Sequence, residues 1–221
     1  MTTIGSKHRI AYVTSSKHKV EEIQVLLEKG RLTSGNPISS IIKIDIRQVN
    51  IKETLEVDLQ AMVKAEVAKA YSEIKVPCIV EHAGLVFVEL EDKSYPGGLT
   101  KPMWNALGRN FVDETHSAGR QAIARAVVGY CDGMRIDTFV GETIGQIAEA
   151  PRGSRDFYWD VIFIPREAKD SAKGRTYAEI VDDPTLGLEY KVLKLSQSTR
   201  AMLKLFDFLQ ETGRPKLWPG R

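Results

Sequence analysis

A strand, a polar turn and a helix follow one another near the N-terminus, and this order constrains the fold more than any other feature of the sequence. Arg9–Thr14 is rich in β-branched and aromatic residues, which is typical of a short buried strand. Ser15 and Ser16 follow, and both suit the N-cap of a helix. Lys19–Lys29 then places its apolar residues at helical spacing and ends before a glycine. The segment predicts an α/β fold in which a strand leads directly into a helix.

The middle of the chain continues this mixture of strands and helices. Ile41–Val49 alternates apolar and polar residues and predicts a strand, whereas Leu59–Ile74 has one apolar face and predicts a helix. Two strand-like runs follow, Cys78–Val80 and Leu85–Val88, and Glu81–Gly84 joins them. These segments predict that further strands and helices are added to the first unit.

The second half of the chain predicts both helices and strands. The expected elements are a turn at Tyr95–Gly98, short helices at Met103–Phe111 and Ala118–Val128, a hairpin over Gly129–Gly145, a strand at Val161–Ile164 and an amphipathic helix at Ser198–Leu209. Together the elements predict one α/β domain over residues 1–211, with a mixed central sheet, flanking helices and two lobes around a cleft. Residues 212–221 are rich in proline and glycine and predict a loose tail.

Charge and composition exclude several classes of protein. The 221 residues include 31 basic and 29 acidic side chains, so the formal net charge of +2 favours neither a nucleic acid nor a membrane as partner. No window approaches the roughly 20 apolar residues of a membrane-spanning helix, and the N-terminus lacks a signal-peptide pattern. The two cysteines, Cys78 and Cys131, have no metal-binding spacing and are expected to be reduced and buried. We therefore expect a cytoplasmic protein.

The first polar cluster that could bind a ligand is Thr14–Glu22, on the turn between the first strand and its helix. Hydroxyl groups, lysines and the free N–H groups of a helix N-terminus together suit phosphate. Lys19 and Glu22 are three residues apart and share a helix face, so one can hold phosphate while the other holds a metal ion. The alternative is that the serines and lysines only cap the helix.

Two later clusters could also bind a ligand, and the first of them suits a nucleotide base. In Pro151–Asp160, aromatic residues precede an acidic one, so rings can stack on a base while the carboxylate accepts from its ring N–H groups. The alternative is an aromatic corner of the core in which Asp160 caps a turn. Lys194–Arg200 opens the last helix with cationic and hydroxyl side chains. The alternative interpretation is that Ser198 only caps this helix and that Arg200 is solvated.

Taken in order, these segments resemble the inosine triphosphate pyrophosphatase family, also called the HAM1 or non-standard purine NTP pyrophosphatase family, from about Ile10 to Leu209. The matching positions are Thr14, Lys19 and Glu22 of its T-G-N-x-x-K-x-x-E turn, the helix lysine Lys64, Glu81–Leu85, Tyr95–Gly97, Pro151–Gly153, Phe157–Phe163, Thr176–Glu179, and Lys194 with Ser198–Arg200.

The resemblance implies a homodimer with a mixed sheet between two lobes, which converts ITP, dITP or XTP to the monophosphate and pyrophosphate with Mg²⁺. On this basis Glu22 and Glu81 are the expected metal ligands, and the expected nucleotide-binding residues are Thr14, Ser16, Lys19, Lys64, Phe157, Trp159, Asp160, Lys194, Ser198 and Arg200. Lys194 and Arg200 carry only hydrogen-bond donors, so beside the base they would favour the six-position oxygen of hypoxanthine over the amino group of adenine.

The sequence departs from the family at the position expected to support cleavage. His82 follows Glu81 where the family has an aspartate, and Ala83 replaces the next hydroxyl. Imidazole is a poor ligand for Mg²⁺, which prefers hard oxygen donors, so the magnesium site is expected to be weakened and catalysis impaired. Thr199 also replaces a family histidine, and Tyr158 replaces a glycine. The alternative is that Glu81 alone supplies the metal ligand and activity is retained.

These features predict a sensor that binds dITP or ITP without destroying it. In this respect the chain also resembles HAM1-like subunits of bacterial anti-phage systems of the Kongming type, which work with a SIR2-like NAD⁺-consuming protein. Two alternatives remain open. One is an active Mg²⁺-dependent pyrophosphatase, and the other is a scaffold that has lost nucleotide binding.

Overall fold

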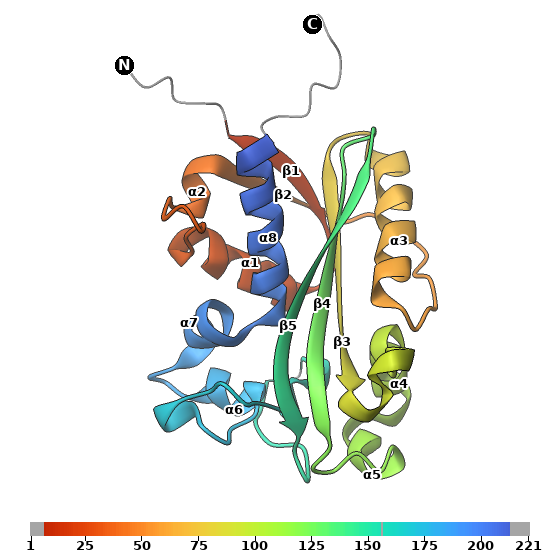
Figure 1. The fold of residues 1–221 in the computed structure, drawn as a ribbon, viewed down its shortest axis with the longest axis vertical. Helices are drawn as coiled ribbons and strands as arrows, with labels where there is room; N and C mark the ends of the chain where they lie inside the picture. The colour runs from red at the N-terminus through yellow and green to blue at the C-terminus, as the bar shows by residue number, and fades with distance from the viewer. Residues whose placement is uncertain (1–6, 156, 213–221) are drawn as a thin grey trace, which may run out of the picture.

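A six-stranded mixed sheet runs through the molecule in the computed structural model, which describes residues 7–155 and 157–212 (Figure 1). The strands are β1 (His8–Val13), β2 (Ile42–Arg47), β3 (Cys78–Phe87), β4 (Gln121–Cys131), β5 (Ile136–Ile147) and β6 (Phe163–Pro165), in the spatial order β2–β1–β3–β4–β5–β6. β1 pairs in parallel with β2 and β3, whereas the pairs from β3 to β6 are antiparallel. The predicted mixed α/β sheet is confirmed.

Helices cover both faces of this sheet. They are α1 (Lys17–Lys29), α2 (Ile38–Ile41), α3 (Leu59–Ile74), α4 (Thr100–Leu107), α5 (Phe111–Glu114), α6 (Tyr177–Asp182), α7 (Gly187–Tyr190) and α8 (Gln197–Thr212). Figure 1 shows α3, α4 and α5 on one side of the long strands, and α1, α7 and α8 on the other. A 3₁₀ turn at Tyr158–Val161 and a π-helical turn at Lys191–Leu195 complete the regular structure that the site uses.

The core is divided between the two faces of the sheet. On the α8 side, Leu205 and Phe206 are fully buried in a cluster that also contains Ile10 of β1. On the other side, α3 lies so close to the sheet that a Cβ atom on Gly129 of β4 would come within 2.5 Å of the Val63 side chain. A glycine at this position allows the close approach, because any larger residue would push the helix away.

Two predicted elements are wrong. The predicted helix at Ala118–Val128 is instead most of β4, because the segment pairs with β3 on one side and β5 on the other, and this tertiary pairing outweighs the helix preference of its alanines. Glu81–Gly84 does not connect two strands but lies within the single strand β3, in register with 125–128 of β4. The predicted β4–β5 hairpin is confirmed, with Asp132 accepting backbone hydrogen bonds in its turn.

The C-terminal prediction extends beyond the described residues. Thr212 closes α8, and the rest of the predicted tail, residues 213–221, lies outside the described part of the chain. Within the ranges that the structure describes, no helix has both the length and the apolar character needed to cross a membrane.

Candidate functional site

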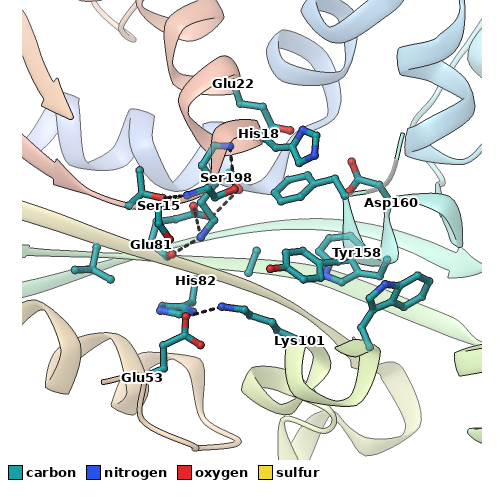
Figure 2. Close-up of a pocket in the computed structure, with 18 of the residues that line it drawn as sticks. Ser15, His18, Glu22, Glu53, Glu81, His82, Lys101, Tyr158, Asp160 and Ser198 are labelled. Carbon is teal, nitrogen blue, oxygen red and sulfur yellow. Dashed lines mark hydrogen bonds and ion pairs between the residues drawn. The ribbon is translucent and has the colours of Figure 1, made fainter. Parts of the chain in front are cut away.

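A pocket of about 900 Å³ lies where the N-terminus of α1, the middle of β3, α4 and the 3₁₀ turn at Tyr158–Val161 meet (Figure 2). Its wall is completed by the segment between β2 and α3 and by the start of α8. The volume is in the range of pockets that hold a whole small ligand. One end is polar and is formed by α1 and β3, whereas the other end carries the aromatic side chains of Phe157, Tyr158 and Trp159.

The N-terminus of α1 forms part of the polar end. Ser16 caps the helix, with its side chain accepting a hydrogen bond from the backbone N–H of Lys19, and its own backbone N–H donates to the hydroxyl of Thr14. Thr14, Ser16 and Lys19 all line the pocket. Because the first N–H groups of a helix have no partner within it and carry partial positive charge, this end of the pocket suits an anion.

Glu81 of β3 is buried beside this helix terminus, and both of its carboxylate oxygens have partners. Oε2 accepts from the Tyr12 hydroxyl at 2.9 Å and lies 3.0 Å from the Lys19 ammonium, while Oε1 accepts from the Ser198 hydroxyl at 2.8 Å. Burial by itself would raise the pKa of Glu81, but the charge of Lys19 and these hydrogen bonds lower it below its ordinary value. Glu81 is therefore held as a carboxylate.

His82, the next residue on β3, is joined to Glu66 of α3. His82 Nε2 lies 2.5 Å from one carboxylate oxygen of Glu66, and the other oxygen accepts from the backbone N–H of Thr54 at 2.9 Å. Burial would raise the pKa of Glu66, but the hydrogen bond and charge of His82, with the Thr54 bond, lower it below its ordinary value. Both oxygens of this carboxylate are also engaged.

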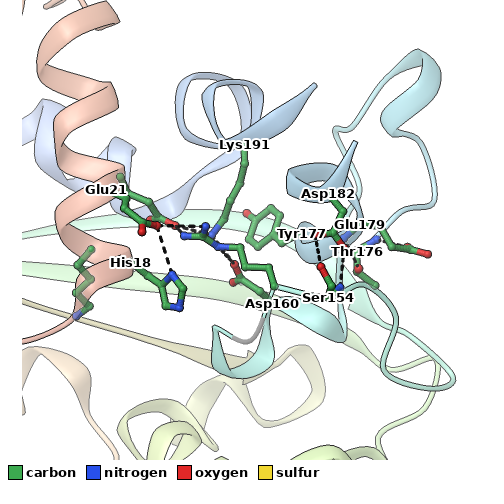
Figure 3. Close-up of polar contacts among 12 residues, drawn as sticks. His18, Glu21, Ser154, Asp160, Thr176, Tyr177, Glu179, Asp182 and Lys191 are labelled. Atoms are coloured by element: carbon green, nitrogen blue, oxygen red, sulfur yellow. Dashed lines mark hydrogen bonds and ion pairs between the residues drawn. The ribbon is translucent and has the colours of Figure 1, made fainter. Parts of the chain in front are cut away.

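The aromatic end is supported from behind by a buried group of charges (Figure 3). The ammonium of Lys191 lies 2.6 Å from Asp160 and 2.8 Å from Glu22, and it sits 5.3 Å from the centre of the Phe157 ring. Burial would lower the pKa of Lys191, but the two carboxylates raise it above its ordinary value. The His18 ring also packs against Phe157 in a tilted arrangement, with 4.7 Å between ring centres.

Comparison with known proteins assigns the chain to a family. A model of the Ham1 family matches residues 10–206. The chain belongs to the Ham1 family. It is 29% identical over 182 residues to inosine triphosphate pyrophosphatase 2 of Trypanosoma cruzi, covering 81% of this chain and 84% of the relative. It is also 27% identical over 209 residues to a dITP/XTP pyrophosphatase of Hyperthermus butylicus, covering 94% and 97%.

Solved structures show the same fold. The HAM1 protein of Coxiella burnetii superimposes with a TM-score of 0.64 at 20% identity, covering 92% of this chain and 98% of that one. The Ham1 protein of Staphylococcus aureus gives a TM-score of 0.61 at 16% identity, covering 93% and 100%. The mixed sheet and its flanking helices are therefore the Ham1 fold.

Most of the residues expected from the Ham1 motifs come together in the pocket. The lining includes Thr14, Ser16, Lys19, Glu22, Glu81, His82, Phe157, Trp159, Asp160 and Ser198. They come from four separate segments of the sequence, and the β1–α1 and β3 segments meet because β1 and β3 are adjacent parallel strands. The sequence motifs therefore identified one site rather than unrelated positions.

Three expected residues lie elsewhere, which corrects their predicted place at the nucleotide. Lys64 is exposed on α3, because Val63 and Val67 occupy the face of that helix that meets the sheet. Lys194 is also exposed. Arg200 borders a different surface groove, where it donates to the backbone carbonyl of Glu142 and pairs with Glu167. In this structure the predicted discrimination against ATP has no basis in Lys194 or Arg200.

Other pocket residues were missed by the sequence reasoning. Lys101 of α4 pairs with Glu53 across the mouth of the pocket, and Lys191, rather than Lys194, reaches Asp160. Glu66 could have been noticed, because it is an acidic residue within the apolar stripe of α3 that contains Met62, Val63, Val67 and Ala70. Lys101 and Glu53 have no such signal, since charged residues on exposed segments are ordinary.

The expected magnesium ligands do not fit that ion in this arrangement. Mg²⁺ needs near-octahedral oxygen ligands, usually carboxylates and waters. Both oxygens of Glu81 are engaged, and one oxygen of Glu22 is shared by Lys191 at 2.8 Å and Arg155 at 3.3 Å. Among the side chains that the structure describes, no three acidic, histidine or cysteine residues are grouped as a metal site. Instead, the side chains of Lys19, Lys191 and Arg155 contact the carboxylates of Glu81 and Glu22.

Proposed function

We propose that this protein binds a deaminated purine nucleoside triphosphate such as dITP or ITP, and holds it as a sensor rather than hydrolysing it rapidly. The names of its relatives support the nucleotide class, since they are pyrophosphatases of inosine triphosphate and of dITP and XTP. The pocket has a polar end beside a helix N-terminus and an aromatic end, which suits phosphates and a purine.

The proposal that the triphosphate is not hydrolysed rapidly rests on one observation, the contact between His82 and Glu66. The family resemblance places an aspartate at position 82, and this chain instead has a ring that occupies a neighbouring carboxylate at 2.5 Å. Glu81, the other acidic group of this segment, already has three partners. With neither carboxylate free to bind a metal ion or to orient water, phosphate cleavage loses its electrostatic support while phosphate binding does not.

Each end of the pocket has a separate role in the bound state. At the polar end, the phosphates accept hydrogen bonds from Lys19, from the hydroxyls of Thr14 and Ser16 and from the first N–H groups of α1. At the aromatic end, Phe157 stacks on the purine, and Asp160 accepts from its ring N–H group. A ligand held at both ends connects α1 and β3 to the 3₁₀ turn, and so stabilises one relative position of these elements.

The second candidate is an active pyrophosphatase that releases the nucleoside monophosphate and pyrophosphate with Mg²⁺. Its support is the name shared by the relatives, together with Glu81, which is retained and ionised. This activity requires Glu81 to exchange Lys19 for a metal ion.

The wider setting of the sensor follows from the resemblance stated above. The proposal includes a cytoplasmic protein with one domain over residues 1–211, a homodimer, and a SIR2-like NAD⁺-consuming partner in anti-phage defence. Bound triphosphate would act by favouring the conformation in which the partner is active. Mixing the two purified proteins and measuring NAD⁺ loss with and without dITP tests this part.

The central test separates binding from cleavage. Purified protein is incubated with dITP and Mg²⁺, and the bound triphosphate and released pyrophosphate are measured in parallel. The Hyperthermus butylicus relative is the positive control. We expect intact dITP to be recovered, and a ligand at 100 times its Kd to stabilise the fold by about 2.7 kcal/mol.

Two results would contradict the proposal. Pyrophosphate release at the rate of the control enzyme would favour the active pyrophosphatase. An unchanged melting temperature at saturating dITP would favour a scaffold without a nucleotide.

A further inference from the structure

We infer that the pocket binds its triphosphate without a divalent metal ion, because lysine side chains bridge carboxylates to phosphates at the places where a metal would do so. The inference rests on the proposed function, since it concerns the same pocket and ligand. The inference implies that removing divalent metal ions with a chelator leaves triphosphate binding intact. The resemblance to magnesium-dependent enzymes does not imply this property.

The first step is the state of the carboxylates in the pocket. Glu81 and Glu53 each have a lysine partner from another segment, Lys19 and Lys101, and Glu66 lies against the ring of His82. The pairs join α1 to β3, β3 to α3, and α4 to the segment before α3. The pocket therefore supplies its own counter-charges to groups that would otherwise require a bound cation.

Lys19 has the geometry of a bridge. An ammonium group has three N–H donors and no acceptor. Lys19 directs two of them to Glu81, one to the carboxylate 3.0 Å away and one to its backbone carbonyl. The third remains for an incoming phosphate oxygen, so the lysine can contact the ligand without abandoning Glu81. The N-terminus of α1 lies beside it and adds partial positive charge.

Lys101 offers a second bridge at the pocket mouth. Figure 2 shows it extending from α4 to Glu53 below His82. Its side chain is about one-third exposed and that of Glu53 is more than half exposed, so the pair is solvated and its partners can be exchanged. An ammonium group has three donors, so Lys101 can contact phosphate while it still touches Glu53.

A divalent ion would meet repulsion in the same place. An ion bound by Glu81 would be repelled by the ammonium of Lys19, which is 3.0 Å from the same carboxylate. An ion at Glu66 would have to displace His82, and the other oxygen of that carboxylate is taken by Thr54. Metal binding therefore breaks existing pairs, whereas phosphate binding to the lysines adds to them.

The experiment is calorimetric titration of the whole protein with dITP, once with Mg²⁺ and once with EDTA. We expect the Kd to differ by less than about threefold between the two conditions. Binding that weakens more than about tenfold in EDTA would overturn the inference and leave the proposed sensor intact. Absence of binding in both conditions would overturn the inference and the proposed function together.

A matched pair of variants provides an internal contrast. His82→Asp places a second carboxylate against Glu66, so the two negative charges require a cation, and binding should become sensitive to EDTA by about tenfold or more. His82→Asn removes the ring but adds no charge, so its binding should be less sensitive to EDTA than that of His82→Asp. Melting curves identify a variant that does not fold, and the wild-type titration still decides the question. Equal sensitivity of the two variants would contradict the bridging role.

Discussion

Two groups of ion pairs border the same pocket, and they differ mainly in burial. Behind Phe157, Lys191 holds Asp160 and Glu22, and the Lys191 and Asp160 side chains are each only 2% exposed. Across the mouth, Lys101 and Glu53 make the same kind of contact with side chains 33% and 56% exposed. Both groups are lysine–carboxylate pairs, but only the pair at the mouth is substantially exposed to solvent.

This difference in burial implies different roles. A buried charge that loses its partner cannot be rehydrated, so the Lys191 group is part of the permanent wall of the pocket. An exposed pair exchanges its contacts with water at little cost, so the Lys101–Glu53 pair can accept a phosphate as a new partner. One end of the pocket is therefore fixed before the ligand arrives, and the other is adjustable.

The largest expected effect comes from removing the buried cation. Lys191→Met should destabilise the fold by about 3–5 kcal/mol, because two buried carboxylates lose their nearest cation and are left beside Arg155, at 3.3 Å from Glu22 and 3.7 Å from Asp160. Lys194→Met is the matched control, since it removes an exposed lysine from the same π-helical turn. Urea unfolding measures both. Equal stability of the two variants would show that the buried wall does not depend on this charge.

The next effect concerns the aromatic end alone. Phe157→Ala should weaken dITP binding by about 1–3 kcal/mol, the typical value of one base stacked on an aromatic ring. Binding of inorganic tripolyphosphate, which has no base, should stay unchanged because its contacts lie at the polar end. Calorimetry with the two ligands makes the comparison. A parallel loss for both would mean that Phe157 shapes the whole pocket rather than the base site.

A smaller effect follows from the lowered pKa of Glu66. Because its folded pKa lies below the ordinary value of 4.5, its ionised form stabilises the fold at higher pH. This contribution is lost as pH falls from that ordinary value through the lower folded value. Glu66→Gln removes the titration, so the stability difference between wild type and variant should shrink on acidification. Urea unfolding from pH 6 to pH 3 measures this difference. A stability difference between wild type and Glu66→Gln that stays constant over this range would contradict the prediction.

The smallest effect on stability is expected at the mouth. Lys101→Ala should change the free energy of unfolding by about 0–1 kcal/mol, as is usual for an exposed pair. It should nevertheless weaken dITP binding several-fold, and this loss should diminish at high salt because the contact is screened. Salt-dependent titrations measure this effect, with Lys93→Ala, an exposed lysine away from the pocket lining, as control. An equal loss at all salt concentrations would exclude a charge contact.

The sequence predicted the start of α1 correctly but predicted β4 as a helix. The serine and lysine residues after β1 were located correctly because N-caps and helix starts are local features, encoded within a few residues. The strand β4 was predicted as a helix because its alanines favour helices, and its two neighbouring strands come from distant parts of the chain. Local preference could not reveal that pairing.

Lys191 and Lys194 show the same limit within the site. The motif spacing selected Lys194, but the π-helical turn at Lys191–Leu195 buries the earlier lysine and exposes the later one. A change in helical period rotates side chains by a fraction of a turn, and no short motif records it.

The amino-acid sequence by itself determined the fold class and the order of the motifs, and it placed a histidine at position 82 directly after Glu81. Only the tertiary structure showed that His82 meets Glu66, that Lys19 pairs with Glu81 and that Arg200 borders a different groove. The reason is that periodicity tells which face of an element is buried, whereas the partner met there depends on how separate elements pack.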